Sequence, residues 1–366
     1  MKRLHQILTL DLLPQLGVYR LTKRLKGLCP FSLFDLSQHE LIKLGFNDAQ
    51  ISTLLDPPID KLTSIEQWLA DNNNRTIINY YDDNYPALLK EISSPPMLLF
   101  CQGNTYLLES PQVAMVGSRV ATISGKETAK RLANELVKAG VCVTSGLATG
   151  IDSYAHQGAL IGGGRTIAVL GSGLNIVYPK SNIELAQRIT ETGLLISEFW
   201  PNTPPNAKQF PRRNRIVSGL SLGVVVVEAA ERSGSLITAR LAAEQNREVF
   251  AIPGSINNPK VAGCHKLISQ GAKLITCAAD ILEEFLQYQF VNAETPDKHL
   301  VSPSTQHDGT LDPVLACIGY DTTPIDLIAQ RCNLSINVVL ERLLSLELSG
   351  EISSLSGGYI RIKGEV

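Results

Sequence analysis

The 366-residue sequence lacks several features that would each place it in a distinct class of proteins. Its seven cysteines are scattered and form no Cys-x-x-Cys pair, which argues against a disulfide framework and a zinc site. No apolar run is long enough to cross a membrane, and the first residues lack the apolar segment and cleavage site of a signal peptide. We therefore expect a soluble protein of the cytoplasm that holds no metal and makes no contact with a membrane.

A strong net charge is also missing. The formal net charge is −2, so the chain as a whole is not a polycation that attracts nucleic acid everywhere on its surface. Any site for an anion must therefore be a local cluster. The stretch between Glu198 and Glu228 contains no acidic residue and supplies such a cluster. Its basic residues all fall between positions 208 and 215: Lys208, Arg212, Arg213 and Arg215.

A chain of this length is expected to form two or three domains. Residues 1–75 carry apolar positions that recur every three to four residues, which predicts a small helical domain of the SAM or helix-hairpin-helix type. Such a domain either contacts DNA or docks a protein, and a purely structural role stays open. Residues 290–310 are polar and aperiodic, which is typical of a linker. Residues 311–366 are expected to form three helices and a two-stranded turn, the pattern of a winged helix.

Residues 76–289 are expected to form the core, in which short apolar runs alternate with helical patterns. Most runs are rich in Val or Ile, as is typical of strands covered on both faces. The alternation predicts right-handed crossovers and a doubly wound parallel sheet of the α/β class. The expected strands are 113–117, 141–145, 166–170, 194–198, 223–228, 248–252 and 272–276. The expected helices are 124–139, 152–161, 181–192, 235–246 and 261–270.

Three of the apolar runs stop at glycine-rich turns, which can hold phosphates at the carboxyl edge of a sheet. In Gly117-Ser118-Arg119, glycine lets a ligand approach, and the hydroxyl and guanidinium can hold a phosphate oxygen. We prefer this anion site to a plain turn because a helix start follows. The other turns are Ser145-Gly146-Leu147-Ala148-Thr149-Gly150 and Gly171-Ser172-Gly173. Neither completes Gly-x-Gly-x-x-Gly, so no dinucleotide cofactor is expected.

Three further groups of residues suit a nucleic acid. Tyr178 can stack on a base and Lys180 can meet a phosphate, although a capped helix start with an exposed lysine is the alternative. The Pro-rich loop Phe210-Pro211-Arg212-Arg213-Asn214-Arg215 combines cations with an aromatic ring, as single-stranded nucleic acid requires. The alternative is a solvated loop, and we expect at least one of its arginines to turn inward. Ser233-Gly234-Ser235 ends the fifth strand and opens a helix.

The sequence offers two pairs of candidate catalytic residues. Asp152 and His156 are one helical turn apart, but an acid at a helix start and a packed histidine are the preferred interpretation. Glu198 and Glu228 each end a strand, and two carboxylates above a pocket can act in hydrolysis. We expect them instead to accept hydrogen bonds from the nearby arginines, so no catalytic residue is assigned.

Taken together, these runs resemble the DprA/Smf family, the DNA-processing proteins of bacterial transformation. The resemblance covers about residues 100–285, and only the architecture extends to the two end domains. It implies an extended Rossmann-like fold that binds single-stranded DNA, helps to load the RecA recombinase, forms a homodimer and has no established enzymatic activity. The matching segments occur in order: Val116-Gly117-Ser118-Arg119, residues 145–152, His156, residues 170–173, Tyr178-Pro179, Ser197-Glu198, Phe210-Pro211-x-Arg213-Asn214-Arg215-Ile216, Glu228-Ala229, residues 233–238, residues 250–254 and residues 263–268.

The resemblance also implies roles for individual residues. Arg119 and Lys180 would be the main DNA contacts, and Arg213 and Arg215 would line the same pocket. The expected DNA-binding set is Gly117, Ser118, Arg119, Ser145, Gly146, Gly150, Gly171, Gly173, Tyr178, Lys180, Phe210, Arg212, Arg213, Asn214, Arg215, Ser233, Gly234 and Ser235. The homodimer would form through the last part of the core, at His265, Leu267, Ile268 and Leu274.

Two other functions stay open. The related phosphoribohydrolases of the Lonely Guy type, which cleave nucleotide N-glycosidic bonds, carry Pro-Gly-Gly-x-Gly-Thr-x-x-Glu at a strand-to-helix turn. The comparable residues 231–238 lack the double glycine and the final glutamate. A double-stranded DNA regulator acting through the winged helix is the third candidate. Residues 311–366 hold more acidic than basic groups, which opposes that role and favours docking of a protein.

Overall fold

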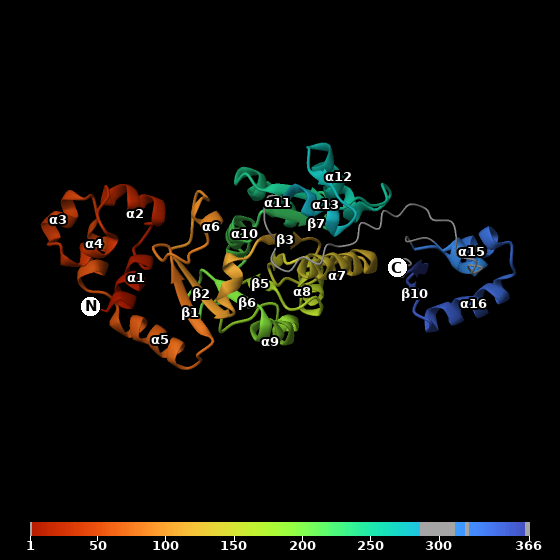
Figure 1. Ribbon diagram of the computed structural model, residues 1–366, viewed down its shortest axis with the longest axis horizontal. Helices are drawn as coiled ribbons and strands as arrows, with labels where there is room; N and C mark the ends of the chain where they lie inside the picture. Colours follow the sequence, from red (N-terminus) through yellow and green to blue (C-terminus); the bar gives the residue numbers. More distant parts are fainter. Residues whose placement is uncertain (1, 286–311, 319–321, 363–366) are drawn as a thin grey trace. The chain divides into compact units, whose positions relative to one another are not determined.

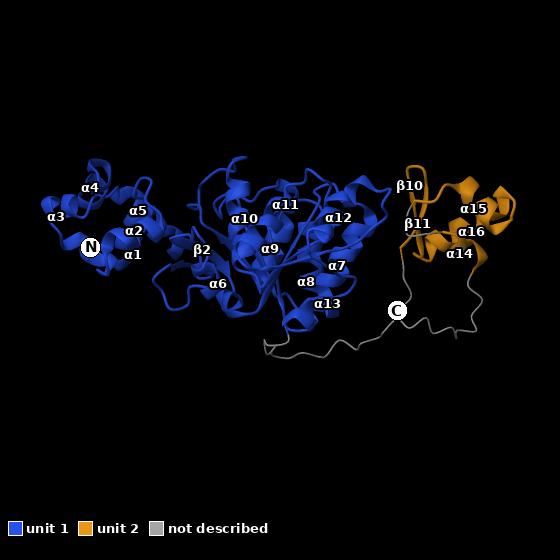
Figure 2. Ribbon diagram, turned by 90° about the horizontal axis from the view of Figure 1, so that it is seen from above, with its two compact units in different colours: residues 1–296 blue, residues 297–366 orange. Residues whose placement is uncertain are grey.

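The computed structural model describes residues 2–285, 312–318 and 322–362 (Figure 1). The chain divides into two compact units, residues 1–296 and residues 297–366 (Figure 2). Among the described residues, no helix has the length and apolar character needed to span a membrane. The linker predicted at 290–310 lies outside the described residues, and the domain boundaries drawn from the sequence stay predictions.

A mixed sheet of nine strands runs through the described part of the first unit, in the order β1-β2-β6-β5-β4-β3-β7-β8-β9. All neighbours from β6 to β9 are parallel. These strands match the seven runs predicted from the sequence, so the α/β fold class is confirmed. The strands are β1 Arg75–Asn79, β2 Leu98–Gly103, β3 Gln112–Val116, β4 Cys142–Ser145, β5 Thr166–Val169, β6 Leu194–Ser197, β7 Gly223–Val226, β8 Glu248–Ala251 and β9 Lys273–Leu274.

The expectation of an entirely parallel sheet is wrong at one edge. β2 pairs antiparallel with β6, and β1 pairs antiparallel with β2. Leu98 to Cys101 of β2 are all buried, so this strand satisfies the backbone groups that β6 would otherwise leave unpaired.

Helices cover both faces of this sheet (Figure 1). The side chains of β3 alternate: Val113 and Met115 pack with α7 and α8, while Ala114 and Val116 pack with α10 and α11. The helices that follow the strands are α7 Ile123–Lys138, α8 Ile151–Ile161, α9 Ile183–Thr192, α10 Gln209–Gly219, α11 Ser235–Glu244, α12 Ala262–Ser269 and α13 Ala278–Leu282.

α10 replaces the arginine-rich loop that the sequence predicted. Pro211 lies in the first turn, where a helix does not need its N–H. Ile216, Val217 and Leu220 lie near the end of the helix and are buried against the sheet. The polar first turns hid this helix, because its apolar residues all come late in the segment.

The N-terminal helices share a hydrophobic core with the sheet. Leu62 and Trp68 belong to the same buried cluster as Leu98 and Leu195 of the strands. The Trp68 indole N–H also donates to the Asn175 side chain, 2.9 Å away. These helices are α1 Arg3–Asp11, α2 Val18–Leu25, α3 Gln38–Lys43, α4 Asp48–Leu55 and α5 Ile59–Ala70, and α6 Ala87–Lys90 precedes β2.

The second unit contains the helices and the hairpin of a winged helix, as predicted. A small core of its own holds Val314, Ile328, Val339, Leu343 and Ile352. The elements in its described part are α14 Pro313–Cys317, α15 Ile325–Cys332, α16 Ile336–Leu348, β10 Ile352–Leu355 and β11 Gly358–Arg361.

Candidate functional site

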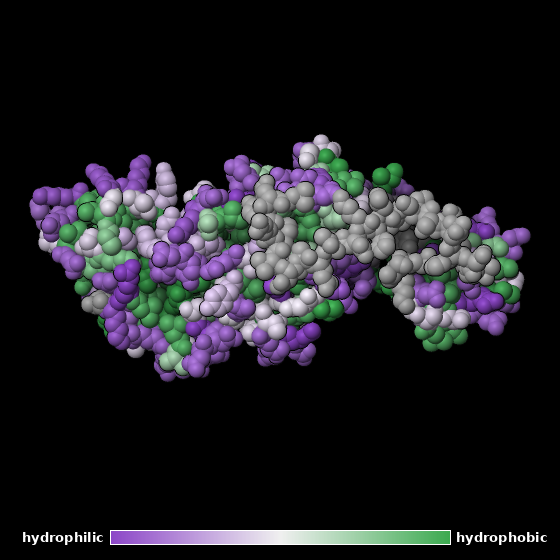
Figure 3. Space-filling view, in the orientation of Figure 1, coloured by the Kyte–Doolittle hydropathy of each residue, from purple (hydrophilic) through white to green (hydrophobic). Residues whose placement is uncertain are grey.

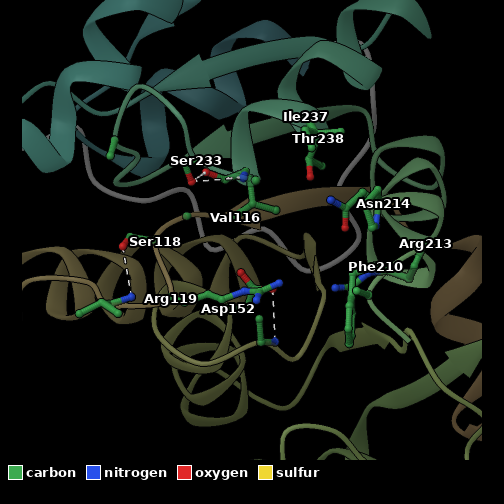
Figure 4. Close-up of a pocket in the computed structure, with 18 of the residues that line it drawn as sticks. Val116, Ser118, Arg119, Asp152, Phe210, Arg213, Asn214, Ser233, Ile237 and Thr238 are labelled. Atoms are coloured by element: carbon green, nitrogen blue, oxygen red, sulfur yellow. Dashed lines mark hydrogen bonds between the residues drawn. The ribbon is translucent and has the colours of Figure 1, made fainter. Parts of the chain in front are cut away.

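A cavity of about 820 Å³ opens at the carboxyl ends of β3 and β7 (Figure 4). From β3 the chain moves outward through β4, β5 and β6, and then returns to β7 on the other side of β3. The loops after β3 and β7 therefore diverge, and ligands of open α/β sheets bind at such a switch point. The lining residues are Val116, Gly117, Ser118, Arg119, Val120, Ala148, Asp152, Tyr178, Pro205, Ala207, Phe210, Pro211, Arg213, Asn214, Ala230, Arg232, Ser233, Gly234, Ser235, Ile237 and Thr238.

Phe210 of α10 forms an aromatic wall of the cavity. The ring of Tyr178 lies beside it, with 5.5 Å between ring centroids and 38° between ring planes. The guanidinium carbon of Arg119 lies 5.8 Å from the centroid of Phe210 (Figure 4). Arg119 is exposed, and Tyr178 is 48% exposed. A planar ring entering the cavity thus meets two aromatic side chains and a cation that lies over one of them.

Arg213 is the arginine that turns inward. It is 4% exposed, and its guanidinium donates to the carbonyl of Val169 at the end of β5. Its neighbour Asp152 accepts the N–H groups of Gly146 and Ala148, at 3.1 and 3.4 Å. Burial raises the pKa of Asp152, and the Arg213 charge opposes that shift. Burial lowers the pKa of Arg213 to about 10, which leaves the guanidinium charged at neutral pH.

An internal carboxylate holds the start of α7. The Thr122 N–H donates to both carboxylate oxygens of Glu228, at 3.1 and 3.2 Å, and the Thr122 hydroxyl donates at 2.5 Å. The Ser118 N–H donates to the backbone carbonyl of Glu228, 2.6 Å away. The carboxylate thus holds the first turn of α7, so the contribution of a free helix start is absent, while Gly117, Ser118 and Arg119 still line the cavity and the anion site there stays a prediction. The expectation that Glu228 accepts hydrogen bonds from arginines is wrong.

The start of α11 is open to the cavity. Ser233, Gly234 and Ser235 line it, and the first turn of α11 contains no acidic residue. The N-cap residue Gly234 has no side chain to cap the helix, and a Cβ atom added there would meet nothing within 4 Å. The first N–H groups already have acceptors: Ser235 donates to the Ser233 hydroxyl at 3.3 Å, and Leu236 and Ile237 donate to backbone carbonyls. Arg232 precedes the turn and also lines the cavity. An anion here would therefore meet Arg232, the two serine hydroxyls and the positive end of the helix dipole.

α10 directs its arginines to opposite sides. Arg213 and Asn214 line the cavity, whereas Arg212 and Arg215 do not. The Glu198 carboxylate instead accepts from Arg212, at 3.0 Å, and from Arg215. This confirms the pairing of Glu198 with arginines. It also shows that Arg215 does not share the pocket of Arg213, because side chains two positions apart on a helix point in different directions.

Several predicted glycines support the cavity from behind instead of lining it. A Cβ atom at Gly146 would collide with the guanidinium of Arg213, and one at Gly171 would lie 2.7 Å from the Phe210 ring. These turns therefore give room to the side chains that do line the cavity. Lys180 is exposed two residues beyond Tyr178 and is not a lining residue. The predicted residues outside the lining are Ser145, Gly146, Gly150, Gly171, Gly173, Lys180, Arg212 and Arg215.

Sequence reasoning missed part of the lining. Arg232 and Thr238 flank the predicted Ser233-Gly234-Ser235 turn in the sequence. Their closeness to that turn is the one sequence feature that could have indicated that they line the same cavity. Asp152 was recognised as an acid at a helix start but was not placed in the binding site, and the others are small or apolar residues with no chemical signature. The missed residues are Val116, Val120, Ala148, Asp152, Pro205, Ala207, Pro211, Ala230, Arg232, Ile237 and Thr238.

The cavity holds little that suits catalysis. Asp152 is the single carboxylate among its described lining residues, which include no histidine or cysteine. His156 is fully buried elsewhere, and its Nδ1 lies 2.7 Å from the Thr166 hydroxyl. Burial lowers the pKa of His156 to about 3, and Arg213 adds to this shift. The interpretation of His156 as a packed histidine is confirmed. No group of three or more metal-ligating side chains occurs in the described ranges.

The residues suggested for a dimer contact lie at one end of the sheet. Leu274 is on the last strand, β9, and is 47% exposed. Leu267 and Ile268 of α12 are half-buried against the core. The His265 ring nitrogen Nε2 lies 3.0 Å from the carbonyl of Gly254.

Comparisons with known proteins point to one family. Residues 76–286 match the family described as DNA recombination-mediator protein A, and residues 298–358 match the DprA winged helix domain. The chain is 42% identical to protein Smf of Escherichia coli (strain K12) over 325 residues, which cover 88% of this chain and 87% of that protein.

Two solved structures are similar over the first unit. DNA processing protein A from Streptococcus pneumoniae is 36% identical with a TM-score of 0.69, covering 79% of this chain and 99% of that one. DNA processing protein A from Helicobacter pylori is 32% identical with a TM-score of 0.53, covering 58% and 96% of the two chains. The second structure concerns the single-stranded DNA binding mode of that protein.

Proposed function

The chain belongs to the DNA recombination-mediator protein A family, and we propose that it holds single-stranded DNA in the cavity at the ends of β3 and β7. We propose further that it acts in the cytoplasm as a homodimer, protects incoming single strands during natural transformation and helps to load RecA on them. The observation that carries the DNA-binding proposal is the Phe210 wall with the Arg119 guanidinium over its ring, in the same cavity as Arg232 and the start of α11.

These groups suit a polynucleotide of any sequence. Every base presents a flat face, so a ring such as Phe210 can receive any of them, while cations track the backbone. Arg119 and Arg232 are exposed and can meet phosphates, and the serine hydroxyls and the positive end of the α11 dipole can add a third contact. Asp152 is the one acidic lining residue, and Arg213 and two backbone N–H groups face it. The cavity therefore keeps an excess of positive charge.

A binding role fits the cavity better than an enzymatic one. Thr238 occupies the position at which the phosphoribohydrolase motif has its glutamate, and the threonine cannot act as a general base there. We therefore propose that the protein is not an enzyme. Incubation with nucleoside monophosphates should release no base. Turnover that disappears in a Glu228→Gln variant would establish the enzymatic alternative.

The proposed homodimer would form at the edge of the sheet that ends in β9. This strand contributes only Lys273 and Leu274, and Leu274 is exposed. An exposed apolar side chain on an edge strand is a common feature of a protein–protein contact. Leu274→Asp should shift the protein toward the monomer in sedimentation experiments without weakening the binding of a short oligonucleotide.

The winged helix is not the proposed DNA contact. α16 exposes Ile336, Leu340 and Leu344, and its single cation Arg342 faces Asp312, 3.8 Å away. A helix that enters a DNA groove usually presents free cations, so this face favours a protein partner. Deletion of residues 300–366 should preserve most of the affinity for single-stranded DNA, whereas loss of that affinity would favour the double-stranded DNA regulator.

Fluorescence anisotropy with labelled oligo-dT tests the proposed function. Arg119→Ala with Lys180→Ala should weaken binding at every salt concentration, and each lost phosphate contact should make the log–log salt slope shallower by about 0.7. Arg131→Ala is a suitable control, because Arg131 is also exposed but pairs with Glu135 on the outer side of α7. Unchanged affinity in the double variant would contradict the assignment of the cavity.

A further inference from the structure

A second acid-free segment lies in the N-terminal helices. No acidic residue occurs between Asp11 and Asp35, and this stretch contains all of α2. Its composition parallels that of the segment containing α10, with several cations and an aromatic residue. The basic residues of the stretch are Arg20, Lys23, Arg24 and Lys26.

α2 and its C-cap present one aromatic ring and two cations to solvent. Tyr19 and Lys23 lie at i and i+4 on the exposed side of the helix, and Lys26 follows as the C-cap residue in a left-handed conformation. Tyr19 is 68% exposed and both lysines are exposed. None of the three side chains has a hydrogen-bond or salt-bridge partner among the described residues. Figure 3 shows hydrophilic side chains projecting over the region of α2 and α3.

The other cations of this segment have internal roles. Arg24 donates to the side chain of Gln50, at 2.7 Å, and its guanidinium lies 5.4 Å from the centroid of Phe46. Arg20 donates to the backbone carbonyl of Gln15, at 3.2 Å. The free face of α2 is therefore limited to Tyr19, Lys23 and Lys26.

A second cavity, of about 440 Å³, lies between the start of α2 and α10. Gly17 and Val18 line it on one side and Arg212 of α10 on the other. Lys61 of α5 also lines it, with its ammonium 4.5 Å from the ring centroid of Trp200. Cations thus occur at intervals from α10 to α2.

The carboxylates of this second cavity are already held by internal donors. Asp11 accepts the indole N–H of Trp200, at 2.8 Å, and Glu198 accepts from Arg212 and Arg215. Arg212 remains largely exposed, with 62% of its side chain accessible. The two acids therefore leave Lys61 and the outer part of Arg212 open to a polyanion.

α10 separates the two cavities and contributes to both. Phe210, Arg213 and Asn214 line the first cavity, and Arg212 lines the second. A strand held against Phe210 needs to cross only one turn of this helix to reach Arg212. Beyond Arg212 it meets Lys61 and then α2.

We infer that single-stranded DNA leaves the first cavity across Arg212 and Lys61 and ends on α2, a path that we name the outer track. On α2, Tyr19 stacks on a base, and Lys23 and Lys26 contact phosphates. This arrangement repeats the combination of ring and cations that single-stranded nucleic acid requires. The inference rests on the proposed function of the first cavity, since it extends the footprint of the same strand.

The length of the oligonucleotide separates the outer track from the first cavity. An oligo-dT of about 6 nucleotides reports on the first cavity, and one of about 25 nucleotides also reaches α2. In the full chain, Lys23→Glu with Lys26→Glu should leave the short-oligonucleotide affinity unchanged. The same variant should bind the long oligonucleotide about tenfold more weakly, with a salt slope shallower by about 1.4 for two lost phosphate contacts.

The matched control is Lys43→Glu with Lys138→Glu, which changes the net charge equally. Both lysines are exposed, and Lys138 lies in the last turn of α7, away from the carboxyl edge of the sheet. This control should bind both oligonucleotides nearly as the wild type does. Tyr19→Ala should weaken only the long-oligonucleotide complex, and Tyr19→Phe should restore it because the ring is retained.

Several outcomes would overturn the outer track. If the α2 variant and its control bind the long oligonucleotide equally well, the outer track does not exist, and the proposed function of the first cavity is unaffected. If the α2 variant loses as much affinity for a DNA duplex as for the single strand, α2 binds double-stranded DNA instead. Unchanged DNA binding combined with loss of an acidic protein partner assigns the face to that partner. A wild-type chain that binds neither oligonucleotide overturns both proposals.

Discussion

Two helices begin at the same cavity, and their starts are used in different ways. The start of α7 is closed by the carboxylate of Glu228, which reaches Thr122 from the end of β7. The start of α11 has no acidic residue, and only the neutral Ser233 hydroxyl accepts its first N–H, at 3.3 Å. Both follow glycine-containing turns that look equally suitable for phosphate in the sequence. An internal partner therefore decides whether such a turn stabilises the fold or remains available to a ligand.

The arginines of the cavity divide in the same way. Arg213 is buried and donates to the end of β5, whereas Arg119 is exposed and its guanidinium lies over the Phe210 ring. Removal of a structural cation should lower stability, and removal of a free cation should lower affinity. The following predictions test this division, beginning with the largest effect.

Arg213→Ala should lower the free energy of unfolding by about 3 kcal/mol, because it leaves Asp152 buried without its neighbouring charge. Arg119→Ala should change it by less than about 0.5 kcal/mol, since the side chain is exposed. Urea denaturation followed by circular dichroism measures both values. Similar urea midpoints for the two variants would contradict the claim that Arg213 stabilises the fold while Arg119 does not.

Glu228→Gln should lower the free energy of unfolding by about 2 kcal/mol, because charged hydrogen bonds at the start of α7 become neutral. The control is Glu244→Gln, which removes an exposed charge that pairs with Arg240. The same denaturation experiment compares them. A Glu228 variant as stable as its control would mean that the start of α7 does not depend on this carboxylate.

Gly171→Ala and Gly234→Ala form a matched pair of glycine substitutions. A Cβ atom at Gly171 would crowd the Phe210 ring, so about 1 kcal/mol of stability should be lost and oligo-dT affinity should fall. A Cβ atom at Gly234 meets open space and should be tolerated. Thermal unfolding and anisotropy together show whether Gly171 supports the aromatic wall, and indistinguishable variants would refute that role.

Arg232→Ala should weaken oligo-dT binding about threefold and make the salt slope shallower by about 0.7, because one phosphate contact is lost beside α11. Arg240→Ala, later on the same helix and paired with Glu244, is the control. Equal affinities in anisotropy would exclude the open helix start as a phosphate contact.

Most of the parallel sheet could be predicted, because each strand is a short Val- or Ile-rich run bounded by turns. The antiparallel edge could not, since the direction of β2 depends on which strand it meets in space. α10 was hidden because Pro211 and the arginines fill its first turns, and its buried residues come later.

The residue types of the site could be predicted better than their directions. The glycines, Phe210 and the arginines other than Arg232 were recognised as a group. Which face of α10 carries Arg213 and which carries Arg215 depends on helical phase, and that phase was unknown while the segment was taken as a loop. The pairing of Glu228 with Thr122 joins residues 106 positions apart and leaves no local signal.

The most direct test of the central claim is a crystal structure or a crosslinked complex with a short oligo-dT. The account predicts a base against Phe210, a phosphate at Arg119 and another at the open start of α11. A strand bound at the winged helix, or one that approaches neither Arg119 nor α11, would contradict it.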